Sequence, residues 1–144
     1  GNPKKIRAVA DIAKPKVKIV NREIGSGARR LLDKQLNATG IKPNRVKGYR
    51  DEVLSHLDVA SRIRVGAADA GIGVRAAASI NGLDFVPLQR ERYDLVIPKA
   101  HYEALQGMKN FLDIIVSKPF RQELEALGGY DTRETGVMQN LQMG

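Results

Sequence analysis

The chain has 144 residues, and 42% of them are hydrophobic, which is enough for a packed globular fold. It contains no run of about 18 apolar residues that could span a membrane, and its charged start lacks the apolar core of a signal peptide. With no cysteine, disulfides, thiolate zinc sites and cysteine nucleophiles are excluded. We therefore expect a soluble protein that makes no membrane contact. The lack of cysteine does not by itself separate the cytoplasm from the periplasm, and we expect a cytoplasmic location.

The net charge of +8 is concentrated in the first third of the chain. Residues 1–50 hold 14 Lys or Arg against 3 acidic residues, whereas residues 51–144 hold 10 against 13. Such a basic segment fits a solvated surface, a nucleic-acid interface, or an electrostatic funnel toward a small anion. Nucleic acid is the least favoured of the three, because only four Tyr and three Phe are scattered along the chain without a basic-aromatic platform.

The first predicted elements are a strand at residues 17–20, rich in β-branched side chains, and an amphipathic helix at residues 28–36. Residues 37–40, Asn-Ala-Thr-Gly, are typical of a helix end. A turn is predicted at residues 41–44 and a short extended piece at residues 45–49.

A second helix is predicted to begin at Ser55, a good N-cap residue with Asp58 three positions later, and to end at Gly66. Residues 67–74 are small and interrupted by glycine, which favours a buried strand closely approached by another backbone or by a ligand. A short helix at residues 75–80 follows.

Two further strands are predicted at residues 83–88 and 93–98, and two helices at residues 102–116 and 118–127. Strands and helices thus alternate through the first two thirds of the chain. This order predicts an α/β fold with a mostly parallel sheet flanked by helices, and with a helical C-terminal part.

The run Gly25-Ser26-Gly27 lies at a predicted strand-to-helix junction, with Arg22 and Arg29 on either side. The first amide groups of a helix have no internal partner and the helix dipole is positive there, so this turn suits a bound oxyanion. The alternative is a plain helix N-cap with glycines that satisfy the turn, and an arginine paired with Glu23.

Ser55 and His56 begin the second predicted helix and offer another cluster of amide groups. For His56 a capping role is favoured over catalysis, because no hydrolase motif accompanies it. Asp69, near Gly71, is an acid that would repel an anion, and strand packing is favoured for it. There Asp69 would orient a backbone amide or an arginine.

A set of short motifs in chain order resembles one known family. The motifs are Gly1-Asn2-Pro3, Asn21-Arg22, Gly25-Ser26-Gly27-Ala28-Arg29-Arg30-Leu31-Leu32-Asp33, Gly48-Tyr49, Ser55-His56, Val59-Ala60, Gly66, Ala68-Asp69-Ala70-Gly71-Ile72-Gly73, Gly82-Leu83-Asp84-Phe85-Val86-Pro87-Leu88, Glu91-Arg92-Tyr93-Asp94-Leu95 and Gly129-Tyr130-Asp131. They resemble the periplasmic-binding-protein-like (type II) domain of molybdate-related transcriptional regulators and molybdopterin biosynthesis proteins.

The resemblance implies a domain fused behind a helix-turn-helix DNA-binding domain, or at the C-terminus of a molybdopterin biosynthesis protein of bacteria or archaea. It also implies that residues 1–144 are a fragment of one domain that lacks most of the first lobe. Residues 15–88 would be the second lobe, and residues 89–144 the return segment and C-terminal helices. Sheet edges exposed by the truncation would favour a homodimer.

The function implied is non-catalytic binding and sensing of a small oxyanion similar to molybdate or tungstate, with no cofactor. The family has threonine where this chain has Ala28, so one hydroxyl donor near the ligand is missing. The alternative is an enzyme or accessory domain of molybdenum cofactor biosynthesis that binds a phosphorylated pterin or a nucleotide. The ligand-binding residues expected are Arg22, Gly25, Ser26, Gly27, Ala28, Arg29, Ser55, His56, Asp69 and Gly71.

Overall fold

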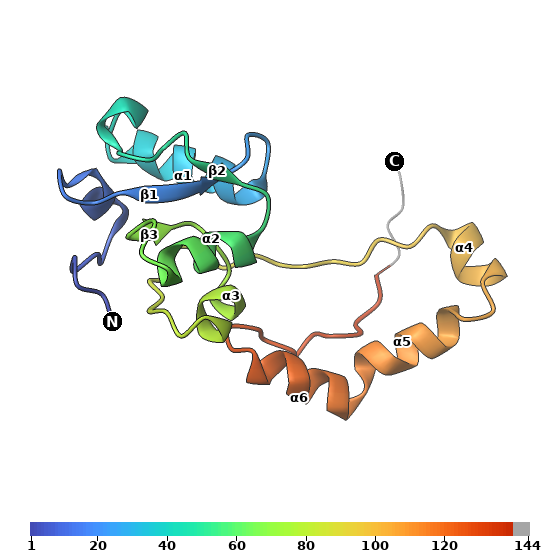
Figure 1. The fold of residues 1–144 in the computed structure, drawn as a ribbon. Coiled ribbons are helices and arrows are strands. Elements are labelled where there is room, and N and C mark those ends of the chain that lie inside the picture. Colours follow the sequence, from blue (N-terminus) through green and yellow to red (C-terminus); the bar gives the residue numbers. More distant parts are fainter. Residues whose placement is uncertain (140–144) are drawn as a thin grey trace. The chain divides into compact units, whose positions relative to one another are not determined.

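The computed structural model describes residues 1–139, and the chain divides into two compact units, residues 1–88 and residues 89–144. The first unit contains a sheet and three α-helices, and the second is helical (Figure 1). The elements of the first unit are η1 (Val9–Ala13), β1 (Ile19–Arg22), α1 (Gly27–Ala38), η2 (Pro43–Arg45), β2 (Glu52–Val53), α2 (His56–Arg64), β3 (Ala70–Gly71) and α3 (Arg75–Ile80).

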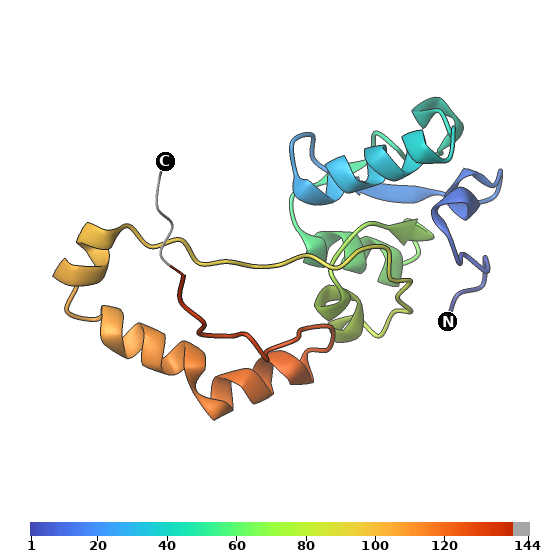
Figure 2. The same ribbon diagram turned by 180° about the vertical axis from the view of Figure 1, so that it is seen from behind.

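The three strands form a parallel sheet in the order β2-β1-β3. Helix α1 connects β1 to β2 in one direction across the sheet, and α2 connects β2 to β3 in the other. Since such crossovers are right-handed, the two helices cover opposite faces of the sheet. Figures 1 and 2 show α1 and α2 on opposite sides of β1. The predicted α/β class is therefore confirmed as a mixed α/β fold with a small parallel sheet.

Strand β1 is the centre of the unit, because all four of its residues are buried. Ile19 points into the apolar cluster under α1, and the next residue, Val20, packs under α2. The cluster under α1 contains Val9, Ile12, Val17, Ile19, Leu32, Leu36, Val46 and Ile72, and that under α2 contains Val20, Val59 and Ala68.

Three predicted helices of this unit are confirmed, with small shifts at their ends, as α1, α2 and α3. The predicted strands are less accurate. The first begins two residues later than expected, and only Ala70–Gly71 of residues 67–74 form a strand. The extended piece expected at residues 45–49 is reduced to a single bridge between Lys47 and Lys18, and β2 follows it at Glu52–Val53.

Two glycines allow the strands of this small sheet to approach closely. A Cβ atom at Gly71 would lie 2.5 Å from Cγ1 of Val59 and 2.8 Å from the carbonyl oxygen of Val20. At Gly48, where φ is +84°, a Cβ atom would lie 2.0 Å from the carbonyl oxygen of Ile19. The expectation of a strand closely approached by another backbone is therefore confirmed at Gly71.

The second unit contains α4 (Lys99–Ala104), α5 (Met108–Val116) and α6 (Lys118–Ala126). None of these three helices buries a side chain against the described residues. Helix α6 begins as predicted, with the Ser117 hydroxyl accepting from the amide of Phe120, and is followed by Gly128 and Gly129, both at positive φ. No helix among residues 1–139 is long and apolar enough to cross a membrane.

Two predictions for the later part of the chain are wrong. The single helix expected at residues 102–116 is broken between α4 and α5, where Leu105 is extended and Gly107 interrupts the helical pattern. Residues 83–88 and 93–98 form no strand, because no segment within residues 1–139 pairs with them. Their β-branched and aromatic composition favours a strand, but a strand needs a neighbour for its backbone groups.

Replacing Gly48 by alanine tests the close approach of the chain to β1. We expect Gly48→Ala to lower the free energy of unfolding by about 3 kcal/mol or more, from left-handed strain and the backbone clash together. Gly40→Ala is the matched control, because Gly40 also has positive φ, +68°, but its Cβ would meet nothing within 4 Å. That variant should lose only about 1 kcal/mol in urea unfolding. Equal losses would show that the contact with Ile19 is unimportant.

Candidate functional site

The carboxyl ends of the three parallel strands meet at one edge of the sheet, which we call the carboxyl edge. The chain leaves β1 toward β2 on one side and later returns to β3 on the other side. In open α/β sheets, ligands bind in the crevice at such a reversal of strand order. The reversal here lies between the segments that follow β1 and β3, which begin with Glu23 and Ile72.

Helix α1 begins at this edge after a tight turn at Gly25, whose φ is +94°. The Ser26 hydroxyl accepts from the amide of Arg29 at 3.1 Å and donates to the carbonyl oxygen of Glu23 at 2.9 Å. The amides of Gly27 and Ala28 meet no acceptor among residues 1–139. The donors left for an anion are therefore backbone amides, while the Ser26 hydroxyl caps the helix.

Helix α2 begins at the same edge on the opposite face of the sheet. The hydroxyl of Ser55 accepts from the amide of Asp58 at 3.0 Å and donates to its carboxylate at 2.7 Å, so the predicted cap is confirmed. His56 is the first residue of the helix, and its imidazole packs beside Gly73, where a Cβ atom would lie 3.6 Å from Nδ1. The start of α2 therefore adjoins the exit of β3.

The cation at this edge is Arg22, the last residue of β1, which is buried. Its guanidinium donates to both carboxylate oxygens of Glu23, from Nε at 2.8 Å and from Nη2 at 2.9 Å. These hydrogen bonds hold the pKa of Glu23 below its ordinary value. The sequence offered a surface arginine paired with Glu23 as the alternative account of Arg29. The partner of Glu23 is instead Arg22, which is buried.

Arg29 lies in the first turn of α1, and its side chain is committed to structural contacts. Its Nη1 donates to Glu52 at 2.8 Å, and its Nε lies 3.2 Å from both carboxylate oxygens of Asp33. The guanidinium also stacks on the ring of Tyr49, 4.3 Å from the centroid, and the Tyr49 hydroxyl donates to Asp33 at 2.6 Å. Arg29 therefore ties α1 to β2 and to the segment before β2.

Asp69 lies at the opposite, amino edge of the sheet, just before β3. Its carboxylate accepts from the backbone amide of Lys18 at 2.8 Å, and its own amide donates to the Lys18 carbonyl at 2.7 Å. The interpretation that Asp69 orients a backbone amide is therefore confirmed. The structure does not bring Asp69 to the residues around Ser26, and Gly71 serves the packing of β3 described above.

Glu23 and Gly73 belong to the edge but were absent from the residues expected to bind the ligand. For Glu23 the signal in the sequence is its position directly after a basic residue at a strand end. Gly73 could be found only from the approach of His56, which depends on the crossover of α2. Among the described residues, no group of three or more His, Asp or Glu side chains is arranged to hold a metal ion.

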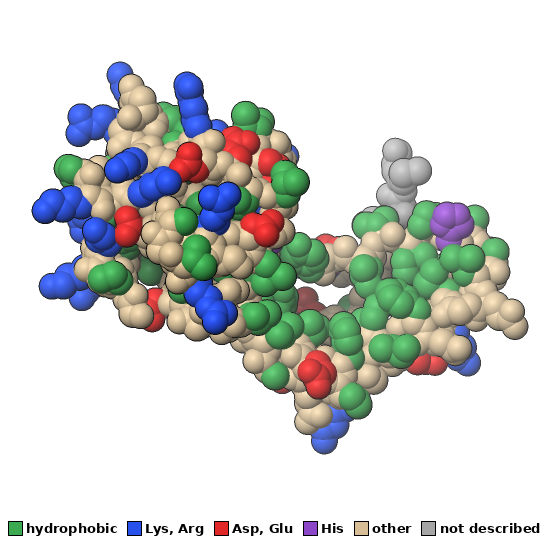
Figure 3. All heavy atoms as spheres, in the orientation of Figure 1, with side chains coloured by type: hydrophobic (Ala, Val, Ile, Leu, Met, Phe, Trp, Pro, Cys, Tyr) green, Lys and Arg blue, Asp and Glu red, His purple; other side chains and the backbone are tan. Residues whose placement is uncertain are grey.

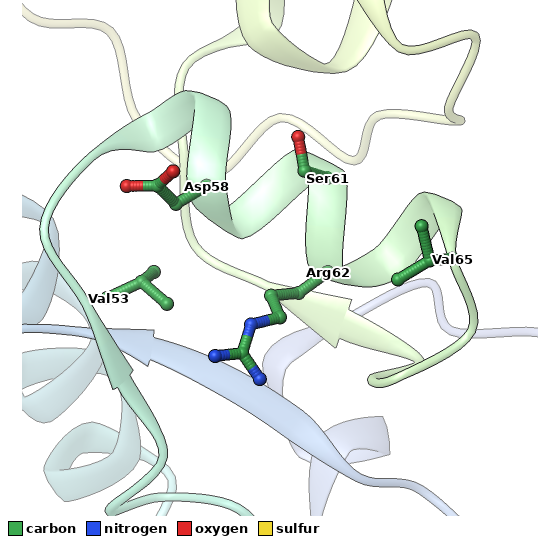
Figure 4. Close-up of a pocket in the computed structure, with 5 residues that line it drawn as sticks. All are labelled: Val53, Asp58, Ser61, Arg62 and Val65. Carbon is green, nitrogen blue, oxygen red and sulfur yellow. The ribbon is translucent and has the colours of Figure 1, made fainter.

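A shallow hollow of about 240 Å³ lies along α2 and β2, lined by Val53, Asp58, Ser61, Arg62 and Val65 (Figure 4). A neighbouring hollow of about 220 Å³ is lined by Val20, Asp51, Glu52, Val53 and Arg62. Acidic side chains outnumber the one arginine in their walls. These hollows therefore offer an oxyanion less than the helix starts do.

Comparison with known proteins identifies similar sequences. The family described as PBP superfamily domain matches residues 1–116. The uncharacterized protein YvgK of Bacillus subtilis is 43% identical over 136 residues, which are 94% of this chain and 43% of YvgK. This chain therefore spans less than half the length of that relative. No solved structure shows significant similarity to the chain.

Two further relatives differ in how much of them this chain covers. An uncharacterized protein from the 5′ region of a ferredoxin 2Fe-2S gene of Clostridium pasteurianum is 46% identical over 107 residues, 74% of this chain and 94% of that protein. The molybdate-binding protein ModA of Mycobacterium bovis is 42% identical over 76 residues, 50% of this chain and 26% of ModA.

The structural role of Arg29 can be tested against its neighbour Arg30, which is exposed. We expect Arg29→Met to lower the free energy of unfolding by about 2 kcal/mol, because it removes two ion pairs and the stacking on Tyr49. The loss stays moderate because Asp33 and Glu52 are partly exposed and become hydrated. Arg30→Met should change stability by less than about 0.5 kcal/mol in urea unfolding. Equal effects of the two changes would contradict this role.

Proposed function

We propose, starting from the fact that the chain belongs to the PBP superfamily, that it binds a small oxyanion at the carboxyl edge of its sheet. The observation that carries the proposal is the pair of amides of Gly27 and Ala28, which lack an acceptor within the described chain at the first turn of α1. They follow the end of β1, whose last residue, Arg22, carries a largely buried guanidinium that is paired with Glu23. The similarity to a molybdate-binding protein favours molybdate or tungstate as the ligand.

The surface charge of the first unit supports an anionic ligand. Figure 3 shows Lys and Arg side chains spread over this unit, which contains 17 basic and 8 acidic residues in residues 1–88. A positive potential of this kind raises the local concentration of an anion and its association rate. A direct role in nucleic-acid binding would use the same charges, and it would show a steep dependence on salt.

The described contacts by themselves give weak binding. A helix start contributes up to about 2 kcal/mol, two charge-assisted hydrogen bonds contribute about 1.5 to 3 kcal/mol each, and association opposes binding by at least about 4 kcal/mol. The remainder, about 1 to 4 kcal/mol, corresponds to a Kd in the millimolar range or above. We infer that a facing lobe supplies further donors when it closes over the ligand.

This function requires binding and no catalysis. Among the described residues, the edge brings together a serine cap, a histidine and an ion pair, which suit binding. In a larger cytoplasmic protein, closure on the oxyanion would pass a signal to an attached DNA-binding or molybdopterin biosynthesis domain. The alternative ligand, a phosphorylated pterin or a nucleotide, would place its phosphate on the same amides.

Amide NMR spectra of the chain, recorded during titration with molybdate, tungstate, sulfate, phosphate and a nucleotide, test the proposal. We expect the inorganic oxyanions to shift the amides of Gly27 and Ala28, with molybdate and tungstate binding more tightly than sulfate. A shift with the nucleotide alone would favour the alternative ligand. If no compound moves these amides at tens of millimolar, the oxyanion proposal is wrong.

Gly27→Pro removes one proposed donor without removing the helix. Proline is favoured at the first position of a helix, and Ser26 before it already has the extended backbone that proline requires, with φ −67° and ψ 151°. We expect oxyanion affinity to fall about tenfold, the loss of one charge-assisted hydrogen bond. Gly27→Ala is the matched control, because it keeps the amide and its Cβ meets nothing within 4 Å. An unchanged affinity in the proline variant would exclude this amide from the site.

A further inference from the structure

The ion pair at the end of β1 has a consequence for how an anion reaches the site. We propose that Glu23 is an internal competitor of the ligand, whose carboxylate occupies the Arg22 guanidinium in the empty site and leaves when an oxyanion binds. This inference rests on the proposed function, because it concerns the same site. It assigns Glu23 a part in setting affinity that no resemblance or comparison suggests.

The geometry of the pair matches that of a bound oxyanion. Nε and Nη2 of Arg22 donate in parallel to the two carboxylate oxygens of Glu23, at 2.8 Å and 2.9 Å. This fork is the arrangement by which arginine recognises carboxylate, phosphate and related anions. An oxyanion cannot accept hydrogen bonds from these two nitrogen atoms while the Glu23 carboxylate accepts them.

The two partners differ in their freedom to leave. The Arg22 side chain is 11% exposed, and a buried cation requires a counter-charge. The Glu23 side chain is 34% exposed and can turn into water. Its backbone is fixed, because its carbonyl accepts from both the amide and the hydroxyl of Ser26. Glu23 can therefore release Arg22 by a side-chain rotation without moving the start of α1.

Competition of this kind has a quantitative signature. The free energy needed to displace Glu23 is the same for every ligand that binds to Nε and Nη2 of Arg22. Removing the competitor therefore raises the affinity for all such anions by one common factor. For a ligand that binds only the amides of α1, removing Glu23 changes the affinity only through the change in net charge.

The test compares Glu23→Gln with Asp58→Asn by amide NMR titration of the full chain with molybdate, sulfate and phosphate. Both changes remove one negative charge near Arg22, but Asp58 acts on this guanidinium through its charge and forms no ion pair with it. We expect Glu23→Gln to tighten binding about tenfold for each anion, and Asp58→Asn to tighten it less than about threefold.

Glu23→Asp provides a second variant that keeps the counter-charge for Arg22, in case the glutamine variant does not fold. Its side chain is one methylene group shorter, so the carboxylate no longer reaches both nitrogen atoms, and we expect a rise in affinity of about threefold. If the wild type binds and neither change at position 23 raises its affinity above that of Asp58→Asn, the inference is overturned while the proposed function stands. Binding by none of the proteins would overturn both.

Discussion

The parallel pairing of β1 with both of its neighbours is the constraint on which the first unit depends. A central strand with partners on both sides must be buried on both faces, and the crossovers place α1 on one face and α2 on the other. Because parallel strands end at the same edge, α1 and α2 also begin there. The packing requirement of four buried residues in β1 therefore brings two helix starts to one edge.

The two arginines nearest the glycine turn show how position in the fold decides the role of a charge. Arg29 points along α1 and meets Asp33, Glu52 and the ring of Tyr49, so its charge is used to hold elements together. Arg22 ends β1 on the face covered by α2, and its partner Glu23 is the adjacent residue. A partner so close in sequence connects no two elements, so the Arg22 pair, unlike those of Arg29, holds no tertiary contact in place.

The sequence predicted the local features well and the pairing of strands poorly. Ser55 as a cap, the helix ends at Gly66 and Gly128-Gly129, and the role of Asp69 at a backbone amide follow from residue type and short spacing. Residues 83–88 and 93–98 have strand composition, but a strand exists only with a partner, and composition does not reveal whether one is present.

The candidate site was predictable to the same extent. The turn at Gly25 and the start of α1 lie where the sequence places them, because a strand end, a glycine and a cap are local signals. The ion pair of Arg29 with Glu52, 23 residues away, depends on the register of β2 beside β1. No periodicity in the sequence encodes that register, so the partner of the Arg29 side chain could not be predicted before the fold was known.

The proposed oxyanion site relies on backbone donors, and this determines which ligands it can distinguish. Amides do not titrate, so a tetrahedral dianion is recognised by its charge and by the spacing of its oxygen atoms. Ala28 offers no side-chain donor, but its amide lies at the first turn of α1. Discrimination between oxyanions of different protonation then requires groups other than these amides. In the proposed site such discrimination would come from the Arg22 and Glu23 pair, which also lies at the end of β1.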